Sequence, residues 1–140
     1  MHVHQKLLVQ QSFASVLPIA DAAAALFYAR LFTLDPSLRP MFRGNLQEQG
    51  RKLTQMLTII VNGLDRLDAL IPAVQALGQR HGIYGVMAEH YETVGEALIW
   101  TLAQGLGPDF TAETRAAWVE LYMILATTMQ NAAEAELQFA

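Results

Sequence analysis

The sequence predicts an all-α fold, and three observations support this prediction. Apolar residues recur every three or four positions in each long segment, as they do on one face of a helix. No run alternates between apolar and polar residues in the manner of a strand. Proline and glycine fall between the periodic segments, where they begin or end helices. The 140 residues are 53% hydrophobic, so we expect one domain over residues 1–140 with a substantial core.

Two helices are predicted in the first quarter of the chain. The first covers His4 to Val16. Pro18 begins the second, which runs to Phe32, because proline is tolerated in the first turn of a helix. The residues expected to face inward are Leu7, Leu8, Phe13 and Val16 on the first helix and Ala24, Tyr28, Leu31 and Phe32 on the second.

A short turn and a third helix follow. Asp35-Pro36 begins the turn, and Gly44 interrupts the chain after Phe42. Asn45 precedes Glu48 by three residues, a spacing that resembles a capping box and predicts the start of a helix that ends near Gly63. The expected inner face carries Gln49, Leu53, Met56, Ile60 and Leu64.

The second half of the chain predicts three more helices. Residues 65–68 lead into a helix with Pro72 in its first turn, which ends in a bend where Gly82 and Gly85 flank Ile83-Tyr84. A helix from Met87 to Gln104 ends at Gly105, Gly107 and Pro108, and Thr111 caps the last helix. The inner faces are expected to carry Tyr91, Val94, Leu98 and Leu102, and then Trp118, Leu121, Tyr122, Leu125 and Met129.

His81 is the most informative residue of the chain. It continues an apolar stripe formed by Leu70, Val74 and Leu77, in steps that keep all four residues on one helix face. A buried imidazole needs a hydrogen-bond partner or a metal to offset its desolvation. A lone histidine in this position is more often a satisfied core residue than a ligand, so the stripe alone leaves both interpretations open.

Composition excludes several classes of function. The formal charge of −4, the pI near 5.4 and the lack of a basic stripe argue against nucleic acid as the main partner. We expect no membrane span, because polar residues interrupt every long apolar segment, and Met1 to Gln11 does not resemble a secretory signal. The absence of cysteine excludes thiolate ligands and disulfides and fits a cytoplasmic location.

Four segments together resemble the globin family over nearly the whole chain. Residues 27–32 are similar to the second helix of bacterial single-domain globins, and residues 35–42 to the corner that carries the haem-stacking phenylalanine. Residues 80–86 and 90–95 resemble the segment of the proximal histidine and the helix that follows it. The similarity points to the Vitreoscilla haemoglobin, flavohaemoglobin and neuroglobin-like groups, and it implies a full-length globin fold, a 3-on-3 helical sandwich around haem.

The resemblance also implies a site. His81 corresponds to the proximal iron ligand, with its other ring nitrogen donating to a carbonyl near Leu77. The cofactor is haem b, held without covalent attachment because the chain has no Cys-x-x-Cys-His motif. The remaining expected haem contacts are Phe42 on the porphyrin, Tyr28 and Gln49 as distal donors, Leu53 as the apolar wall, Arg51 and Lys52 near a propionate, and Tyr91 near His81. In some relatives a glutamate of the last helix lies near the proximal histidine, but Ala133 takes the matching place in this chain. Whether Glu134 supports His81 through Tyr91 is left open.

The function implied is high-affinity oxygen binding, since Tyr28 and Gln49 can both hydrogen-bond to bound oxygen. Nitric oxide and carbon monoxide are the other expected ligands. Nitric oxide dioxygenation or peroxidase-like turnover, supplied by an external reductase, is the main alternative. A gas sensor and a haem-free helical interaction module are further alternatives, and a homodimer formed through the last helix is left open.

Overall fold

Six α-helices joined by short 3-10 turns make up the described part of the chain. The computed structural model describes residues 1–83 and 86–139, and the side chains of residues 83 and 136–139 are not considered. The predicted all-α fold is confirmed, because no strand occurs in these ranges. The elements are α1 (Val3–Val16), η1 (Leu17–Ile19), α2 (Ala20–Leu34), η2 (Pro36–Met41), α3 (Leu46–Asn62), η3 (Leu64–Arg66), α4 (Leu67–Ile83), α5 (Ala88–Leu106), η4 (Gly107–Asp109) and α6 (Ala112–Phe139).

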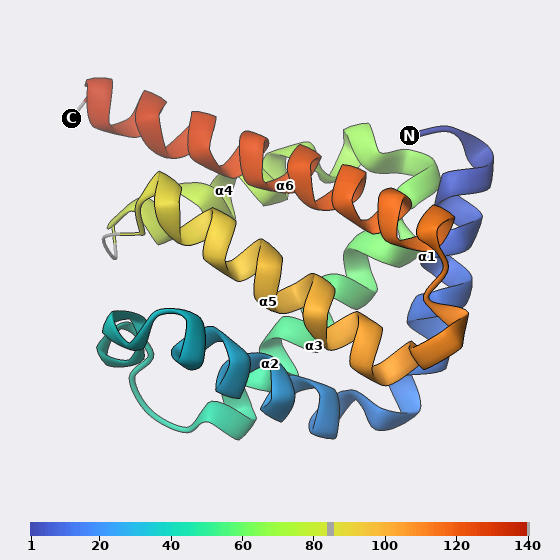
Figure 1. Cartoon of the computed structure of the whole chain (residues 1–140). Helices are drawn as coiled ribbons and strands as arrows, with labels where there is room; N and C mark the ends of the chain where they lie inside the picture. Colours follow the sequence, from blue (N-terminus) through green and yellow to red (C-terminus); the bar gives the residue numbers. More distant parts are fainter. Residues whose placement is uncertain (84–85, 140) are drawn as a thin grey trace.

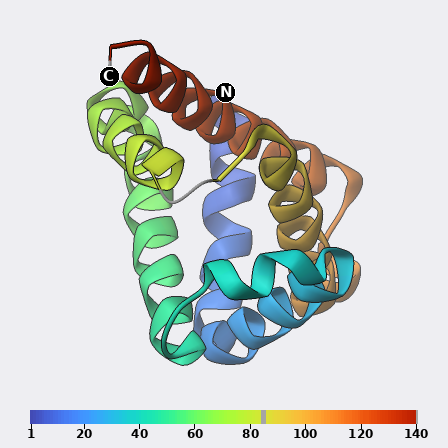
Figure 2. The same ribbon diagram turned by 90° about the vertical axis from the view of Figure 1, so that its left-hand side faces the viewer.

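The helices cross one another in two layers. The most extensive contact joins α4 to α6, and α2 packs against both α5 and α3. Helix α1 packs mainly on α6 and also touches α5 and α3. Figure 1 shows α6 running above α5 with α2 below them, and Figure 2 shows the end of α4 across from η2 and α2. This arrangement places α4 and the η2–α3 segment on opposite sides of one end of the molecule.

The main core lies between α1, α3, α5 and α6 and is centred on Trp118, which is almost fully buried. The indole Nε1 of Trp118 donates to the hydroxyl oxygen of Ser12, 2.8 Å away. Ser12 therefore occupies an inner position of α1 that an apolar residue would otherwise take. Because of this polar inner residue, the predicted face of α1 was partly wrong. Leu7 is 46% exposed, whereas Val9 is fully buried.

Two predicted helix boundaries also need correction. Helix α4 begins at Leu67, directly after η3, so Pro72 lies in its second turn rather than its first. Helix α5 continues through Gly105 to Leu106 and ends at Gly107, whose φ of +55° favours glycine. Asn45 caps α3 as predicted, accepting from the backbone N–H groups of residues 47 and 48.

One of the two predicted bend glycines lies inside a helix. Gly82 belongs to α4, where an added Cβ would stand 2.9 Å from the Cβ of Ala133. Gly82 therefore permits a close approach between α4 and α6. The rest of the predicted bend, Tyr84 and Gly85, lies outside the described residues.

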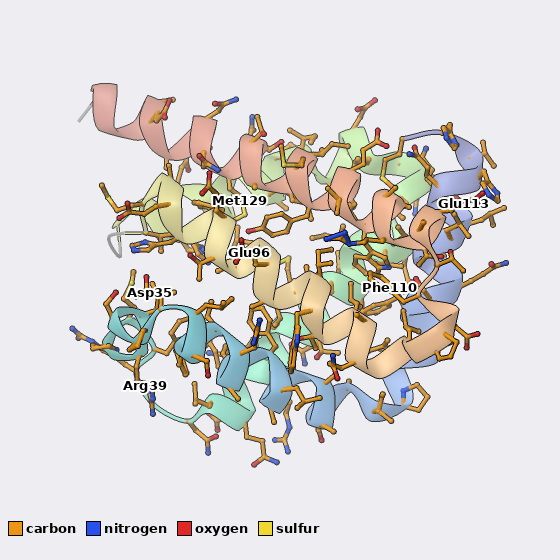
Figure 3. The ribbon with its side chains drawn as sticks, viewed as in Figure 1. Asp35, Arg39, Glu96, Phe110, Glu113 and Met129 are labelled. Carbon is orange, nitrogen blue, oxygen red and sulfur yellow. The ribbon has the colours of Figure 1, made fainter. Side chains whose placement is uncertain are left out.

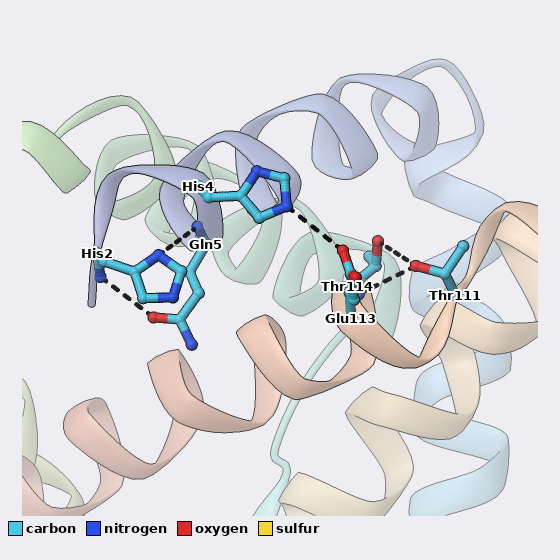
Figure 4. A network of polar contacts seen from close by, with 6 residues as sticks. All are labelled: His2, His4, Gln5, Thr111, Glu113 and Thr114. Carbon is cyan, nitrogen blue, oxygen red and sulfur yellow. Dashed lines mark hydrogen bonds and ion pairs between the residues drawn. The ribbon is translucent and has the colours of Figure 1, made fainter.

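The N-terminal histidines have local structural contacts. His2 caps α1 by accepting from the backbone N–H of Gln5, and the His4 Nε2 lies 3.4 Å from a carboxylate oxygen of Glu113 (Figure 4). Both histidines are exposed, so this network fixes the start of α1 rather than forming a pocket.

One described stretch, Val3–Leu34, is long and apolar enough to cross a membrane by length and composition alone. No such stretch was expected from the sequence. Its residues form the 14-residue α1 and the 15-residue α2, separated by the 3-10 turn at Pro18. Each helix is shorter than the roughly 20 residues that a span requires, and each contributes buried residues to the core.

Candidate functional site

His81 lies in the last turn of α4 and is half-buried. Its Nδ1–H donates to the backbone carbonyl oxygen of Leu77 at 2.8 Å, the contact expected from the sequence. A proton on Nδ1 leaves the lone pair of Nε2 free. Nε2 has no hydrogen-bond partner among the described residues, so this nitrogen is available to coordinate a metal.

Two glycines hold the His81 helix tightly against α6. A Cβ on Gly78 would lie 2.3 Å from the carbonyl oxygen of Met129, which is labelled in Figure 3. One turn later, a Cβ on Gly82 would lie 2.9 Å from the Cβ of Ala133. This close contact fixes where the imidazole stands. This contact was not predicted from the sequence, although two glycines four residues apart on a helix are a usable sign of close helix packing.

Tyr28 forms the centre of an aromatic cluster on the other side of the site. It is 4% exposed, and its ring lies 5.5 Å from that of Phe42 in an edge-to-face arrangement. Phe32 contacts both rings. Burial raises the pKa of Tyr28 to about 12, so the phenol stays protonated at physiological pH. Its hydroxyl makes no hydrogen bond to the residues described by the structure.

The short helix η2 brings Phe42 to this cluster. Pro36 and Pro40 restrict the backbone of η2, and Asp35 caps its start by accepting from the backbone N–H of Ser37 at 3.0 Å. Phe42 follows directly after the helix and is half-buried. Leu53 of α3 packs against the same aromatic cluster.

Helices α2 and α3 cross closely at Gly50, the residue that follows Gln49. A Cβ on Gly50 would lie 2.8 Å from the Cβ of Ala24 and 3.8 Å from the Tyr28 ring. Gln49, the preceding residue, is half-buried, and its amide forms no hydrogen bond to the described part of the chain. Arg51 and Lys52 lie on the same helix with exposed side chains.

Tyr91 is buried near the start of α5. Its backbone carbonyl oxygen accepts a hydrogen bond of 2.5 Å from the hydroxyl of Tyr122, and burial raises the pKa of both phenols. Glu134 is exposed and makes no hydrogen bond to Tyr91. Helix α6 therefore holds the backbone of Tyr91 through Tyr122, a residue expected from the sequence only to belong to the core.

The donor set fits haem better than a bare ion. In residues 1–83 and 86–139 no group of three or more His, Cys, Asp or Glu side chains could hold a metal ion. Helix α4, with His81, packs chiefly on α6 and has no extensive contact with α2 or η2. His81 therefore offers one metal ligand on one side, and Phe42, Leu53, Tyr28 and Gln49 offer apolar surface and two polar groups without protein partners on the other. A planar, apolar, metal-containing group needs this combination.

Comparisons with known proteins identify the family to which this fold belongs. The sequence model of the globin family matches residues 25–129. A flavohemoprotein of Vibrio cholerae is 32% identical over 120 residues, which cover 80% of this chain but only 30% of that relative.

Two solved structures resemble the whole fold. An engineered carbene transferase, made from a candidate nitric oxide dioxygenase of Rhodothermus marinus, is 27% identical with a TM-score of 0.88. The match covers 99% of this chain and 97% of that one. A bacterial globin from Campylobacter jejuni, 21% identical with a TM-score of 0.84, supports the fold alone and covers 98% and 99% of the two chains.

Proposed function

This chain belongs to the globin family of haem proteins that bind diatomic gases, and we propose that it holds oxygen with high affinity between His81 and the Tyr28–Gln49 pair. One observation carries the proposal. The Nε2 of His81, the Tyr28 hydroxyl and the Gln49 amide all lack hydrogen-bond partners among the described residues, although all three side chains are at least half-buried. These three groups remain accessible, because among the described residues only the Arg30 Nε is fully buried without a partner. A ligand can therefore reach all three.

Each residue of the site has a proposed part in binding haem b. His81 would coordinate the iron through Nε2, with the Leu77 carbonyl fixing the orientation of the ring. Phe42 and Leu53 would cover the porphyrin, and Arg51 and Lys52 would reach a propionate from the exposed side of α3. When bound, haem supplies an iron centre that takes up diatomic gases. Tyr91 would lie on the His81 side, with its backbone held by Tyr122.

Two hydrogen-bond donors determine how long oxygen stays in the pocket. Oxygen draws negative charge from ferrous iron, and one hydrogen bond to a charged acceptor contributes about 1.5–3 kcal/mol. At about 1.4 kcal/mol per factor of ten, each donor slows oxygen release about ten- to a hundredfold. Carbon monoxide draws little charge and gains less. The raised pKa of Tyr28 keeps its O–H in the donor form.

The test begins with an absorption spectrum of the purified protein, where a Soret band is expected and its absence would contradict haem binding. Oxygen release from the ferrous protein is then measured by stopped flow for Tyr28→Phe and Gln49→Leu. We expect each variant to release oxygen about tenfold faster or more. Tyr122→Phe is the matched control, because it removes the same hydroxyl from a tyrosine that bonds to the protein backbone. Release at the wild-type rate from both pocket variants would refute the two-donor pocket.

Nitric oxide dioxygenation is the second candidate function. It is favoured by the names of two similar proteins, a flavohemoprotein and a candidate nitric oxide dioxygenase, and by a pocket that holds oxygen long enough to meet nitric oxide. Because this chain spans about 30% of the flavohemoprotein, the activity of that whole protein is itself only a proposal here. Sustained nitrate production from oxygen and nitric oxide, with an added reductase and NADH, would support it. A single turnover that stops would leave oxygen binding as the function.

A further inference from the structure

The positive charge of this acidic protein is concentrated in the chain segment that contains Phe42 and Gln49. Residues 35–52 contain four cations and two acids, a net charge of +2. The rest of the chain contains five cations and eleven acids, a net charge of −6. The four cations of the segment are Arg39, Arg43, Arg51 and Lys52, which we call the basic rim.

The basic rim is exposed and its charges are not neutralised. All four side chains are exposed to solvent, and none forms an ion pair with an acid in residues 1–83 or 86–139. Arg39 projects from the outer edge of η2 in Figure 3, with its guanidinium donating to the carbonyl oxygen of Phe42 at 3.1 Å. The two acids of the segment, Asp35 and Glu48, form no ion pair in residues 1–83 or 86–139 either. The field of the rim therefore reaches the solvent.

The rim belongs to the same chain segment as the pocket. In the sequence, Phe42 lies between Arg39 and Arg43. Gln49 lies two residues before Arg51. A partner attracted to the rim would therefore rest within a few residues of the proposed haem contacts. This position is useful for a partner that exchanges electrons with the haem, because such transfer requires close approach rather than a buried interface.

We propose that the basic rim is the docking surface for an acidic electron-donor protein that reduces the ferric haem. The inference rests on the proposed haem site. In the step itself, one electron leaves the reduced flavin of the donor, and the iron goes from ferric to ferrous. Nucleic acid and an anionic membrane are extended polyanions that would meet the rest of the chain as well as the rim, and that part has a net charge of −6. A small acidic protein can meet the rim alone.

The test uses a strongly acidic flavodoxin as the donor and the haem-loaded protein as the acceptor. Reduction is followed in the Soret band at low ionic strength, about 0.01 M, where the Debye length is about 30 Å. Arg43→Glu is the probe, because Arg43 is exposed and forms no ion pair with the described residues. Arg115→Glu on α6 is the matched control, an equal charge reversal at another exposed arginine. Arg51 and Lys52 stay unchanged because they belong to the proposed haem contacts.

We expect Arg43→Glu to lower the second-order rate constant of reduction about three- to tenfold, and Arg115→Glu to change it less than twofold. Calorimetry with oxidised flavodoxin measures binding without electron transfer. Arg43→Glu should weaken this binding more than Arg115→Glu does. Dithionite is an anion, so its reaction is followed at about 1 M ionic strength, where the Debye length is about 3 Å, and it should then be equal in all three proteins. Equal effects of both reversals would overturn the proposal, since net charge alone would then act. A slower dithionite reaction of Arg43→Glu would overturn it as well, because the haem site itself would have changed.

A missing Soret band would contradict haem binding, and fast oxygen release would contradict the oxygen proposal. A normal spectrum and slow oxygen release, with no effect of Arg43→Glu on reduction, would reject the docking surface alone. A rival occupant is tested with duplex DNA. If the wild type bound it and Arg43→Glu did not, while flavodoxin reduction was unaffected, the rim would be a nucleic-acid surface and the proposal would be wrong.

Discussion

The backbone of Met129 lies directly against Gly78. An added Cβ at Gly78 would stand 2.3 Å from the Met129 carbonyl oxygen and 2.5 Å from its Cα. Both obstacles are backbone atoms, which cannot turn away as a flexible side chain can. The contact belongs to the α4–α6 pair, the most extensive in the fold, and it lies one turn before His81.

We therefore predict that Gly78→Ala destabilises the protein by about 3 kcal/mol, the upper part of the usual range for overpacking. Gly105→Ala is the control, because an added Cβ there meets only Ile19 at 3.5 Å and Val16 at 3.9 Å, both ordinary contacts. It should stabilise α5 by about 0.5 kcal/mol, since alanine favours a helix interior over glycine. Urea unfolding of both variants measures the difference. Equal stability of Gly78→Ala and the wild type would show that the two helices can separate at little cost.

Helix periodicity was enough to predict the fold class and most of the helices. It predicted α3, including its Asn45 cap and its end at Gly63, because capping chemistry is local in sequence. It predicted α1 but was partly wrong about the inner face of that helix, because Ser12 faces inward to meet Trp118, a residue 106 positions away. A contact over that distance leaves no periodic trace.

The candidate site was predictable mainly where local sequence controls it. The bond from His81 to the Leu77 carbonyl spans one helical turn, so the spacing could indicate it. The partner of Tyr91 could not be found in this way, because Tyr122 comes from another helix. The roles of His81, Tyr28 and Gln49 toward haem remain predictions, since they depend on a group that the chain does not encode.

The buried bond between Trp118 and Ser12 should be worth more than an exposed hydrogen bond. Ser12→Ala leaves the Trp118 Nε1–H without its acceptor, in a place where both side chains are buried. We expect a loss of about 1–3 kcal/mol in the free energy of unfolding, the usual cost of an unsatisfied buried donor. Ser15→Ala is the matched control, because Ser15 is exposed and bonds only to the carbonyl of Gln11 in its own helix. Similar losses in both variants would mean that the Trp118 bond adds nothing.

Tyr28 should make stability fall in strongly alkaline solution. Its pKa is raised by burial from 10.0 in the unfolded chain to about 12 in the fold. Below pH 10 both states keep the proton, so the contribution is fully present. Between pH 10 and 12 only the unfolded state loses the proton, and unfolding becomes more favourable as the pH rises. Two pKa units correspond to at most about 3 kcal/mol.

The measurement is urea unfolding of the wild type and Tyr28→Phe from pH 8 to pH 12. Tyr91 and Tyr122, whose pKa values are also raised, act in the same direction in both proteins. The variant should therefore lose less stability over this range than the wild type. Parallel curves would show that Tyr28 ionises in the fold as easily as in the unfolded chain.

Gly50 should control the distal side of the pocket, because it sets the distance between α2 and α3. A Cβ there would lie 2.8 Å from the Cβ of Ala24, so Gly50→Ala must move the two helices apart by a few tenths of an ångström. Gln49 and Tyr28 lie on the separated helices, and hydrogen bonds weaken steeply with poor geometry. We expect oxygen release to become a few times faster, with a stability loss of about 1 kcal/mol.

Adding Ala24→Gly removes the obstructing Cβ and should restore slow release, although glycine in α2 costs about 1 kcal/mol in stability. If the double variant releases oxygen slowly but stays less stable, the release rate depends on the spacing of the two helices and not on stability. Fast release from the double variant would show that this spacing does not position the donors.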